Sequence, residues 1–296
     1  MSVKIKEMKK METAVKKRLA VFGTLTAIFL AAVSVLYWQT RSGLWLTVCM
    51  FTPAVSAVLT RLLTREGWKD LFLKPHFKGS IKWYILAWFA PPLLAYGGAA
   101  LYFLVFPGDF APLHSKYAAS AGAFTMEAYL EALQILPLAV IVNPLMGLAQ
   151  CFGEEFAWRG YLLPKLGTCY SPAAAAVLTG VIWGIWHAPI VAAGYNYGEK
   201  HPLLGIAAMI VFCVVIGTIA GFLFFKVRSV WPVVLFHAAL NGIGLYTAST
   251  LFMGRDPNVF IGLDLTGVLG GAGFILAAAF CLAALVRRRK KADEYS

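Results

Sequence analysis

The sequence predicts an all-α protein, a polytopic membrane bundle of about eight transmembrane helices around an intramembrane cavity. Hydrophobic residues make up 60% of the 296 residues and charged residues only 14%, a balance that a soluble core does not need. Uncharged runs of about 20 residues, enough for a helix to cross a hydrocarbon core of roughly 30 Å, recur along the chain. We therefore expect one membrane domain over residues 19–286, between a basic segment at 1–18 and a basic tail at 287–296.

Charged and polar segments separate the apolar runs and set their bounds. The first run follows the basic segment and lacks a convincing cleavage site, so we expect it to be retained as a span. Two long connections, 61–82 and 107–131, divide the early runs, and segments with charged residues divide the later ones. The expected spans are 19–38, 42–60, 83–106, 132–153, 171–193, 203–225, 229–250 and 265–286.

The positions of Lys and Arg predict the topology. With eight spans, all but four of the 26 basic residues fall on one side of the membrane; the exceptions are Arg41, Lys116, Lys200 and Arg255. Short cytoplasmic loops retain basic residues, so both termini are expected in the cytoplasm, in the cell membrane if the source is prokaryotic. The net charge of +12 then reflects contact with the lipid bilayer, and we expect no nucleic-acid partner.

Two adjacent carboxylates end the fourth run, with an arginine close behind. Glu155 and Arg159 are four residues apart, so they can pair on one side of a helix. Glu154 points about 100° away around the axis and is not committed to that arginine. We expect Glu155 and Arg159 to form a charge clamp, and Glu154 to face the cavity as the general base for a water molecule. A solvated cluster at a helix end is the alternative.

The fifth run contains His187 in an otherwise uncharged stretch, with Trp183 one turn before it. A structural hydrogen bond to a neighbouring helix is the alternative role for such a histidine. Trp158, Trp183 and Trp186 are candidates for a substrate pocket. Interfacial anchoring or core packing is the favoured explanation for these three tryptophans.

The seventh run places His237 and Asn241 four residues apart, and therefore on one helical face. Polar side chains facing lipid would be costly, so both should face the bundle interior. A neutral histidine can accept a hydrogen bond or bind a metal, and an asparagine can donate to a developing oxyanion. Combined with the two earlier motifs, these residues indicate a site for peptide hydrolysis.

The two histidines are predicted at different depths. His187 lies about 15 residues into its span from the cytoplasmic side and His237 about eight, which corresponds to roughly 10 Å at about 1.5 Å per residue. We therefore expect the fifth span either to begin outside the membrane or to tilt strongly.

The three motifs are Glu154-Glu155-Phe-Ala-Trp-Arg159, Trp183-Gly-Ile-Trp-His187 and His237-Ala-Ala-Leu-Asn241. In order and spacing they resemble the EExxxR, FxxxH and HxxxN-like motifs of CAAX-type prenyl endopeptidases and bacteriocin-processing or immunity proteins, the CPBP or Abi family. Trp183 stands where the family pattern has Phe. The resemblance implies an intramembrane protease in which Glu154 activates water, His187 and His237 position it, and Asn241 helps to stabilise the tetrahedral intermediate.

The sequence leaves the use of a metal open. Members of this family are commonly described as metalloproteases, and Glu154, His187 and His237 could ligate Zn²⁺. The chain has no HExxH pair to fix a zinc site by itself. The same three residues could hold the water by hydrogen bonds alone, with Glu154 as a metal-independent base.

The substrate is also left open. A peptide or protein is expected, either the C-terminal tripeptide of a prenylated protein or a secreted peptide or membrane protein. The alternative function is a non-catalytic protein of the immunity or scaffold type that binds a peptide or a partner through the same cavity. A transporter is less favoured, because its charged residues would be spread along a path through both leaflets.

Overall fold

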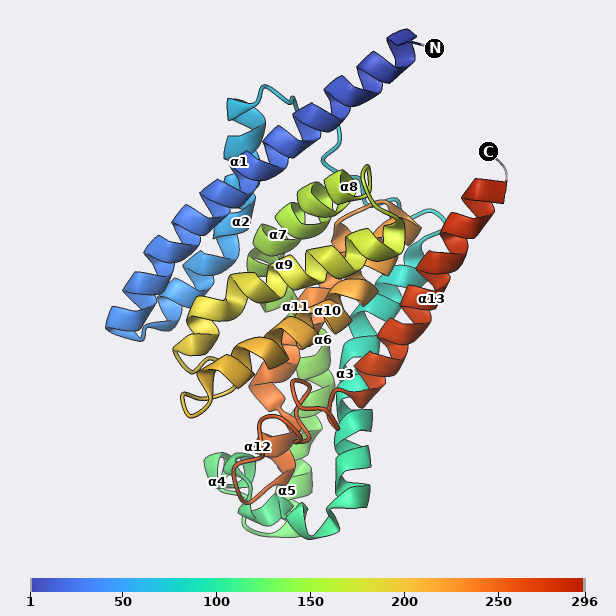
Figure 1. The fold of residues 1–296 in the computed structure, drawn as a ribbon. Helices are drawn as coiled ribbons and strands as arrows, with labels where there is room; N and C mark the ends of the chain where they lie inside the picture. The colour runs from blue at the N-terminus through green and yellow to red at the C-terminus, as the bar shows by residue number, and fades with distance from the viewer. Residues whose placement is uncertain (1, 295–296) are drawn as a thin grey trace.

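The computed structural model describes residues 2–294, with side chains from residue 12 to residue 287. All regular elements in this part of the chain are helices, and an isolated bridge pairs Phe110 with Met253. The helices form a tall bundle with both termini at the same end (Figure 1). The all-α prediction is therefore confirmed. Most of the predicted basic segments 1–18 and 287–296 lies outside the described side chains.

Six helices of the described part are long and apolar enough to cross a membrane, judged by length and composition. They correspond to the first six predicted spans. Local sequence explains where they begin: before the fifth, Ser171 Oγ accepts the backbone N–H of Ala174 at 3.2 Å, and Pro172 occupies the first turn, where a missing N–H costs nothing. The six are α1 (Ser2–Thr40), α2 (Gly43–Leu63), α3 (Ile81–Val105), the stretch Met126–Met146 that joins α5 (Met126–Ala132) through a 3₁₀ turn to α6 (Leu136–Met146), α9 (Pro172–Ala192) and α10 (Pro202–Val227).

The helices at the last two predicted spans differ from the predicted bounds. α11 (Trp231–Ile243) has 13 residues and gives way to a 3₁₀ turn and to α12 (Ala248–Phe252). The final helix, α13 (Ala272–Glu294), starts seven residues later than predicted, because the glycine-rich segment before it folds back on itself. A Cβ atom at Gly270 would lie 2.2 Å from the carbonyl oxygen of Leu263, so only glycine fits there.

The fourth predicted span divides into two helices, and the second continues past the predicted end. α7 (Leu148–Ala157) follows α6 after Gly147 and runs through a π turn at Trp158–Leu162 into α8 (Leu163–Leu166). The charged motif therefore lies within a continuous helical segment. Single π turns inside α-helices are frequent at functional sites.

α9 and α10 pack closely on each other and run obliquely to α3 and α6 (Figure 1). Glycines permit this approach: a Cβ at Gly217 would lie 2.9 Å from the Cα of Gly180, and one at Gly184 would lie 2.5 Å from the Cα of Ile210. α9 is thus inclined relative to α3 and α6, and its tilt or starting point in the membrane stays a prediction. α11 lies in the middle of the bundle and contacts α3, α6, α7 and α10.

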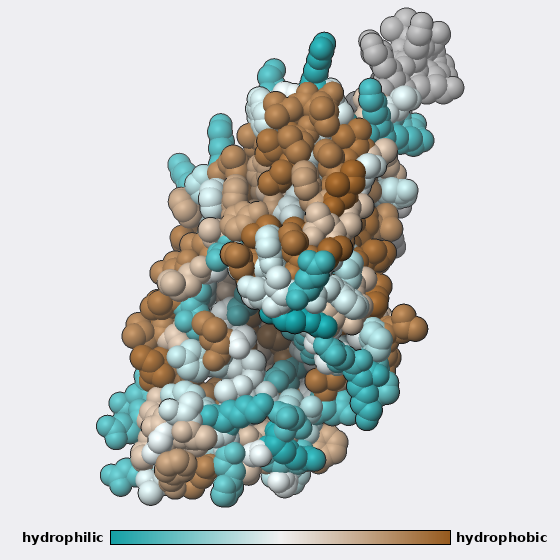
Figure 2. All heavy atoms as spheres, turned by 90° about the vertical axis from the view of Figure 1, so that its left-hand side faces the viewer, coloured by the Kyte–Doolittle hydropathy of each residue, from teal (hydrophilic) through white to brown (hydrophobic). Residues whose placement is uncertain are grey.

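The end of the bundle away from the termini is built from α4 (Lys116–Ala121), α5 and α12 (Figure 1). Figure 2 shows the side of the molecule that carries α1. Its upper part is a broad hydrophobic surface, and a hollow bordered by hydrophilic side chains lies in the middle of this face.

A cluster of charged side chains ties the end of α2 to α8. Glu66 accepts hydrogen bonds from Lys165 Nζ at 2.6 Å and from the Tyr161 hydroxyl at 3.1 Å, and Arg18 and Arg61 lie within 4 Å of its carboxylate. Burial acts to raise the pKa of Glu66, but the hydrogen bond and charge of Lys165, together with Arg61 and Arg18, lower it below its usual value. Folding therefore favours the ionised carboxylate.

We expect Glu66→Gln to lower the stability of the folded protein by about 1–3 kcal/mol at neutral pH, because Lys165 would lose its ionic partner. The contribution of Glu66 is complete above the pKa of the unfolded chain, about 4.3, and is lost as the pH falls through the lower folded value. Thermal denaturation in detergent from pH 7 to pH 3 measures both effects. The control is Glu12→Gln, which removes the exposed pair with Lys16 and should change little. Equal losses in the two variants would contradict the prediction.

Candidate active site

Glu154 lies on α7 with 2% of its surface exposed. Its Oε2 accepts two indole hydrogen bonds, from Trp183 Nε1 of α9 at 2.6 Å and from Trp158 Nε1 at 3.2 Å. Among the described residues, its other oxygen, Oε1, has no hydrogen-bond partner. The carboxylate is thus held in one orientation with one oxygen uncommitted.

In Glu155, by contrast, both carboxylate oxygens have hydrogen-bond partners. Arg159 Nη1 donates to both of its oxygens at 2.8 Å, and Oε1 also lies 2.9 Å from His237 Nδ1 of α11. Glu155 and Arg159 are both completely buried. The pairing expected from their spacing is therefore present, and it extends to the histidine of the third motif.

Arg159 occupies the π turn, and its guanidinium carbon lies 4.6 Å from the ring centroid of Trp183. Its Nη2 is close to Gly217, where an added Cβ would lie 3.3 Å away. Nε and Nη2 have no hydrogen-bond partner among the described residues. A buried charge with two unpaired donors depends heavily on its single carboxylate partner.

The two histidines use the same ring nitrogen, Nδ1, for their hydrogen bonds. His187 Nδ1 lies 2.9 Å from the carbonyl oxygen of Trp183, and His237 Nδ1 faces the carboxylate of Glu155. Because a carbonyl and a carboxylate only accept, we assign a proton to Nδ1 in both rings, which leaves Nε2 of each neutral ring as an acceptor.

Trp183 is the point where the three motifs meet. Its ring centroid lies 5.7 Å from that of His187 and 5.3 Å from that of His237, while its N–H is bound to Glu154. Both histidines therefore lie at the same site, on either side of one indole ring.

The tryptophans predicted as a substrate pocket are buried. Trp158, Trp183 and Trp186 expose 0%, 2% and 5% of their surfaces. Trp186 packs edge-on against His187, with ring centroids 4.8 Å apart, and its N–H has no partner among the described residues. The three indoles contact Glu154 and His187, and their role as a substrate pocket stays a prediction.

Asn241 lies one turn beyond His237, at the exposed side of the site. Its Nδ2 is 3.6 Å from Cys151 Sγ. A second thiol, that of Cys213 on α10, is 3.7 Å from His187 Nδ1. Sequence reasoning did not single out Cys213, because no motif surrounds it and its neighbour is 26 residues away in the chain.

The predicted zinc ligands do not form a three-residue metal site in this arrangement. No group of three or more His, Cys, Asp and Glu side chains placed to hold a metal ion occurs among the described residues. Glu154 Oε2 is occupied by two indole N–H donors, and only the two Nε2 atoms and Glu154 Oε1 remain as possible ligands. Zinc binding stays a prediction.

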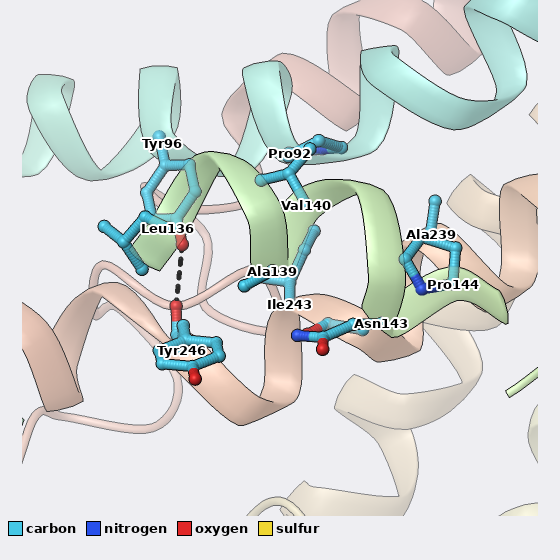
Figure 3. A pocket seen from close by; sticks show the side chains of 11 residues that line it. Pro92, Tyr96, Leu136, Ala139, Val140, Asn143, Pro144, Ala239, Ile243 and Tyr246 are labelled. Carbon is cyan, nitrogen blue, oxygen red and sulfur yellow. Dashed lines mark hydrogen bonds between the residues drawn. The ribbon is translucent and has the colours of Figure 1, made fainter. Parts of the chain in front are cut away.

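A small pocket lies beside α11, between α3 and α6 (Figure 3). Tyr96 donates its hydroxyl to the Tyr246 carbonyl at 2.8 Å, and Asn143 donates to a backbone carbonyl of α11 at 3.3 Å. The α11 residue Ala239 that faces this pocket is two positions past His237, so about 200° further around the helix. The pocket is therefore on a different face of α11 from the histidine.

Together, the fold and the site define a class: a multi-pass helical membrane protein with a buried glutamate held beside two histidines. Residues 132–243, which include all three motifs, match the family described as type II CAAX prenyl endopeptidase Rce1-like. A stretch of 44 residues is 39% identical to CAAX prenyl protease 2 of Methanococcus maripaludis; it covers 15% of this chain and 16% of that protein. The part of the chain that carries the three motifs is therefore similar to this family, over less than half of the chain's length.

Proposed function

We propose that the chain is an intramembrane endopeptidase in which Glu154 activates a water molecule. The observation that carries the proposal is the contrast between the two adjacent carboxylates. Both oxygens of Glu155 are bound by Arg159, whereas Glu154 keeps one oxygen uncommitted and is oriented by two indoles. A general base needs such a positioned and available oxygen.

In the proposed reaction, Glu154 takes a proton from water as the water oxygen attacks the carbonyl carbon of a peptide bond. The same proton then goes to the leaving amine as the C–N bond breaks. The Nε2 atoms of His187 and His237 would accept hydrogen bonds from the water and fix its position. The amide of Asn241 would donate to the oxyanion of the tetrahedral intermediate.

Glu155 and Arg159 support this reaction without contacting the substrate. The Glu155 carboxylate accepts the Nδ1 proton of His237, which holds the ring so that Nε2 faces away from the clamp. Arg159 balances the charge of Glu155 inside the protein.

The substrate class that we favour is a prenylated protein, cut near its C-terminus at the cytoplasmic face. The family description and the name of the archaeal relative support this choice. The test uses the purified full chain and two synthetic peptides with the same CAAX sequence, one farnesylated and one not. Cleavage of the farnesylated peptide alone is expected. Cleavage of both would indicate a broader peptidase, and cleavage of neither would favour the immunity or scaffold alternative.

The zinc content of the pure protein in its active form decides between the two mechanisms that the sequence leaves open. Stoichiometric zinc that is needed for activity would support a metal held by Glu154, His187 and His237. Full activity at a zinc content far below stoichiometric would support the glutamate mechanism without a metal.

Trp183 supplies something that the phenylalanine of the family pattern lacks, an N–H donor for Glu154 at 2.6 Å. We expect Trp183→Phe to lower kcat about three- to tenfold with little change in KM, because the carboxylate would lose one of its two orienting bonds. The matched control is Trp186→Phe, which removes an indole N–H that has no partner among the described residues. Steady-state kinetics of both variants test this; equal effects would show that the N–H bond is not the cause.

A further inference from the structure

A groove lies between α10 and α13 near the end of the bundle that carries the termini. It has a volume of about 620 Å³. Most of its lining is apolar, and two cations complete it. The lining residues are Phe222, Phe225, Lys226, Phe280, Ala283, Ala284, Leu285 and Arg287.

This groove is remote from the proposed active site. The face of α10 that packs on α9 includes Gly217, which lies beside Gly180 and the Arg159 guanidinium. Lys226 is nine residues further along α10, and at about 100° per residue it points to the opposite side of the helix. A ligand in the groove would therefore lie on the outer surface of the bundle, where lipid surrounds a membrane protein.

The two cations in the groove are available for a negatively charged ligand. Lys226 and Arg287 are both exposed, and neither takes part in an ion pair among the described residues. Lys226 Nζ lies 5.2 Å from the ring centroid of Phe222 and 5.8 Å from that of Trp83, so aromatic rings hold its side chain at the groove. Arg287 ends the apolar part of α13.

A second groove along α10 and α13 provides an internal comparison. It has a volume of about 510 Å³ and is lined by apolar side chains such as Phe212 and Ile275, with no charged side chain in its lining. Both grooves can accept hydrocarbon chains. Only the one with Lys226 and Arg287 also offers positive charge at the end of an apolar surface.

We propose that the groove with Lys226 and Arg287 binds one anionic phospholipid. The headgroup phosphate would lie between the two cations, and the acyl chains would pack on Phe222, Phe225 and Phe280. Lipid headgroups with negative charge are attracted by Lys and Arg at the ends of membrane helices, and acyl chains need an apolar surface below the headgroup. The groove supplies both features within one site.

The test is native mass spectrometry of the purified full chain, first with phosphatidylglycerol and then with phosphatidylcholine of the same acyl chains. We expect one phosphatidylglycerol to be retained at least about fivefold more than phosphatidylcholine. Competition between the two lipids on the unaltered protein gives the same information without any variant. Equal retention of both lipids would overturn the proposal. Retention of glycerol phosphate to the same extent as phosphatidylglycerol would also overturn it, since the acyl chains would then contribute nothing.

Two variants locate the site. Lys226→Gln with Arg287→Gln should reduce phosphatidylglycerol retention on the order of tenfold. Ala283→Phe keeps both cations but fills part of the apolar groove, and should also weaken retention. The matched control is Lys69→Gln with Lys78→Gln, which removes two exposed charges outside the groove and leaves retention unchanged. The basic residues at 288–291 are present in all of these proteins, so their attraction for anionic lipid contributes equally to the retention measured for each variant. Unchanged retention in both groove variants would place the lipid elsewhere.

Discussion

Replacement of Glu154 by glutamine should reduce peptide cleavage by about 10²–10⁴-fold while the protein stays folded. Glutamine keeps the shape of the side chain, and its carbonyl oxygen can still accept the indole N–H groups of Trp183 and Trp158. What the variant loses is the ability to take a proton from water. Mass spectrometry of peptide termini in membranes that contain either protein at matched levels measures this without assuming a substrate.

Glu127→Gln on α5 is the matched control, because Glu127 is exposed and lies outside the motifs. New peptide termini in membranes with the unaltered protein and with the control, but not with Glu154→Gln, are the expected result. Identical termini from all three folded proteins would remove the basis for proteolysis and leave a binding function.

Replacement of Arg159 by methionine should destabilise the fold by about 3–5 kcal/mol, the largest stability effect that we expect in this chain. Methionine fills much of the space, but it leaves Glu155 as a buried carboxylate whose one remaining hydrogen-bond partner among the described residues is His237. An uncompensated charge at 0% exposure is strongly unfavourable. Thermal denaturation in detergent, with gel filtration to detect aggregation, measures the loss.

The double variant Glu155→Gln/Arg159→Met separates the charge effect from packing. It removes both charges, so it should recover a large part of the stability lost in Arg159→Met alone. If the double variant is no more stable than the single one, lost packing and lost hydrogen bonds cause the destabilisation, and the buried-charge explanation is wrong.

The sequence predicts much of the fold because hydropathy and length follow directly from composition. The prediction fails where the apolar composition of a segment suggests a span but its backbone adopts another conformation. Residues 265–271 are apolar enough for a span, but Gly267, Gly270 and Gly271 allow close backbone packing, and the chain turns back there. Likewise, the polar residues after Gly153 suggest the end of a span, whereas their mutual pairing lets the helix continue.

For the site, the sequence predicts those contacts that depend on helical spacing, and the Glu155–Arg159 pair is the clearest. It does not predict contacts between helices. The hydrogen bond from Trp183 to Glu154 joins residues 29 positions apart, and the contact of His237 with Glu155 joins residues 82 positions apart. These depend on how α7, α9 and α11 pack, which no local pattern encodes. The catalytic roles, the metal and the substrate stay predictions.

The π turn at Trp158–Leu162 has a consequence for how insertions and deletions would be tolerated. A π turn holds one residue more than an α turn at nearly the same rotation, so the segments on either side keep the register of a regular helix that lacks the extra residue. Glu155 sets the register of the upstream part through His237, and Lys165 sets that of the downstream part through Glu66. Loss of one residue within the π turn would restore regular helix with both anchors still aligned, whereas insertion of a further residue would rotate Lys165 by about 100° relative to Glu155. The segment between these two polar attachments should therefore tolerate the loss of a residue in the π turn better than the gain of one.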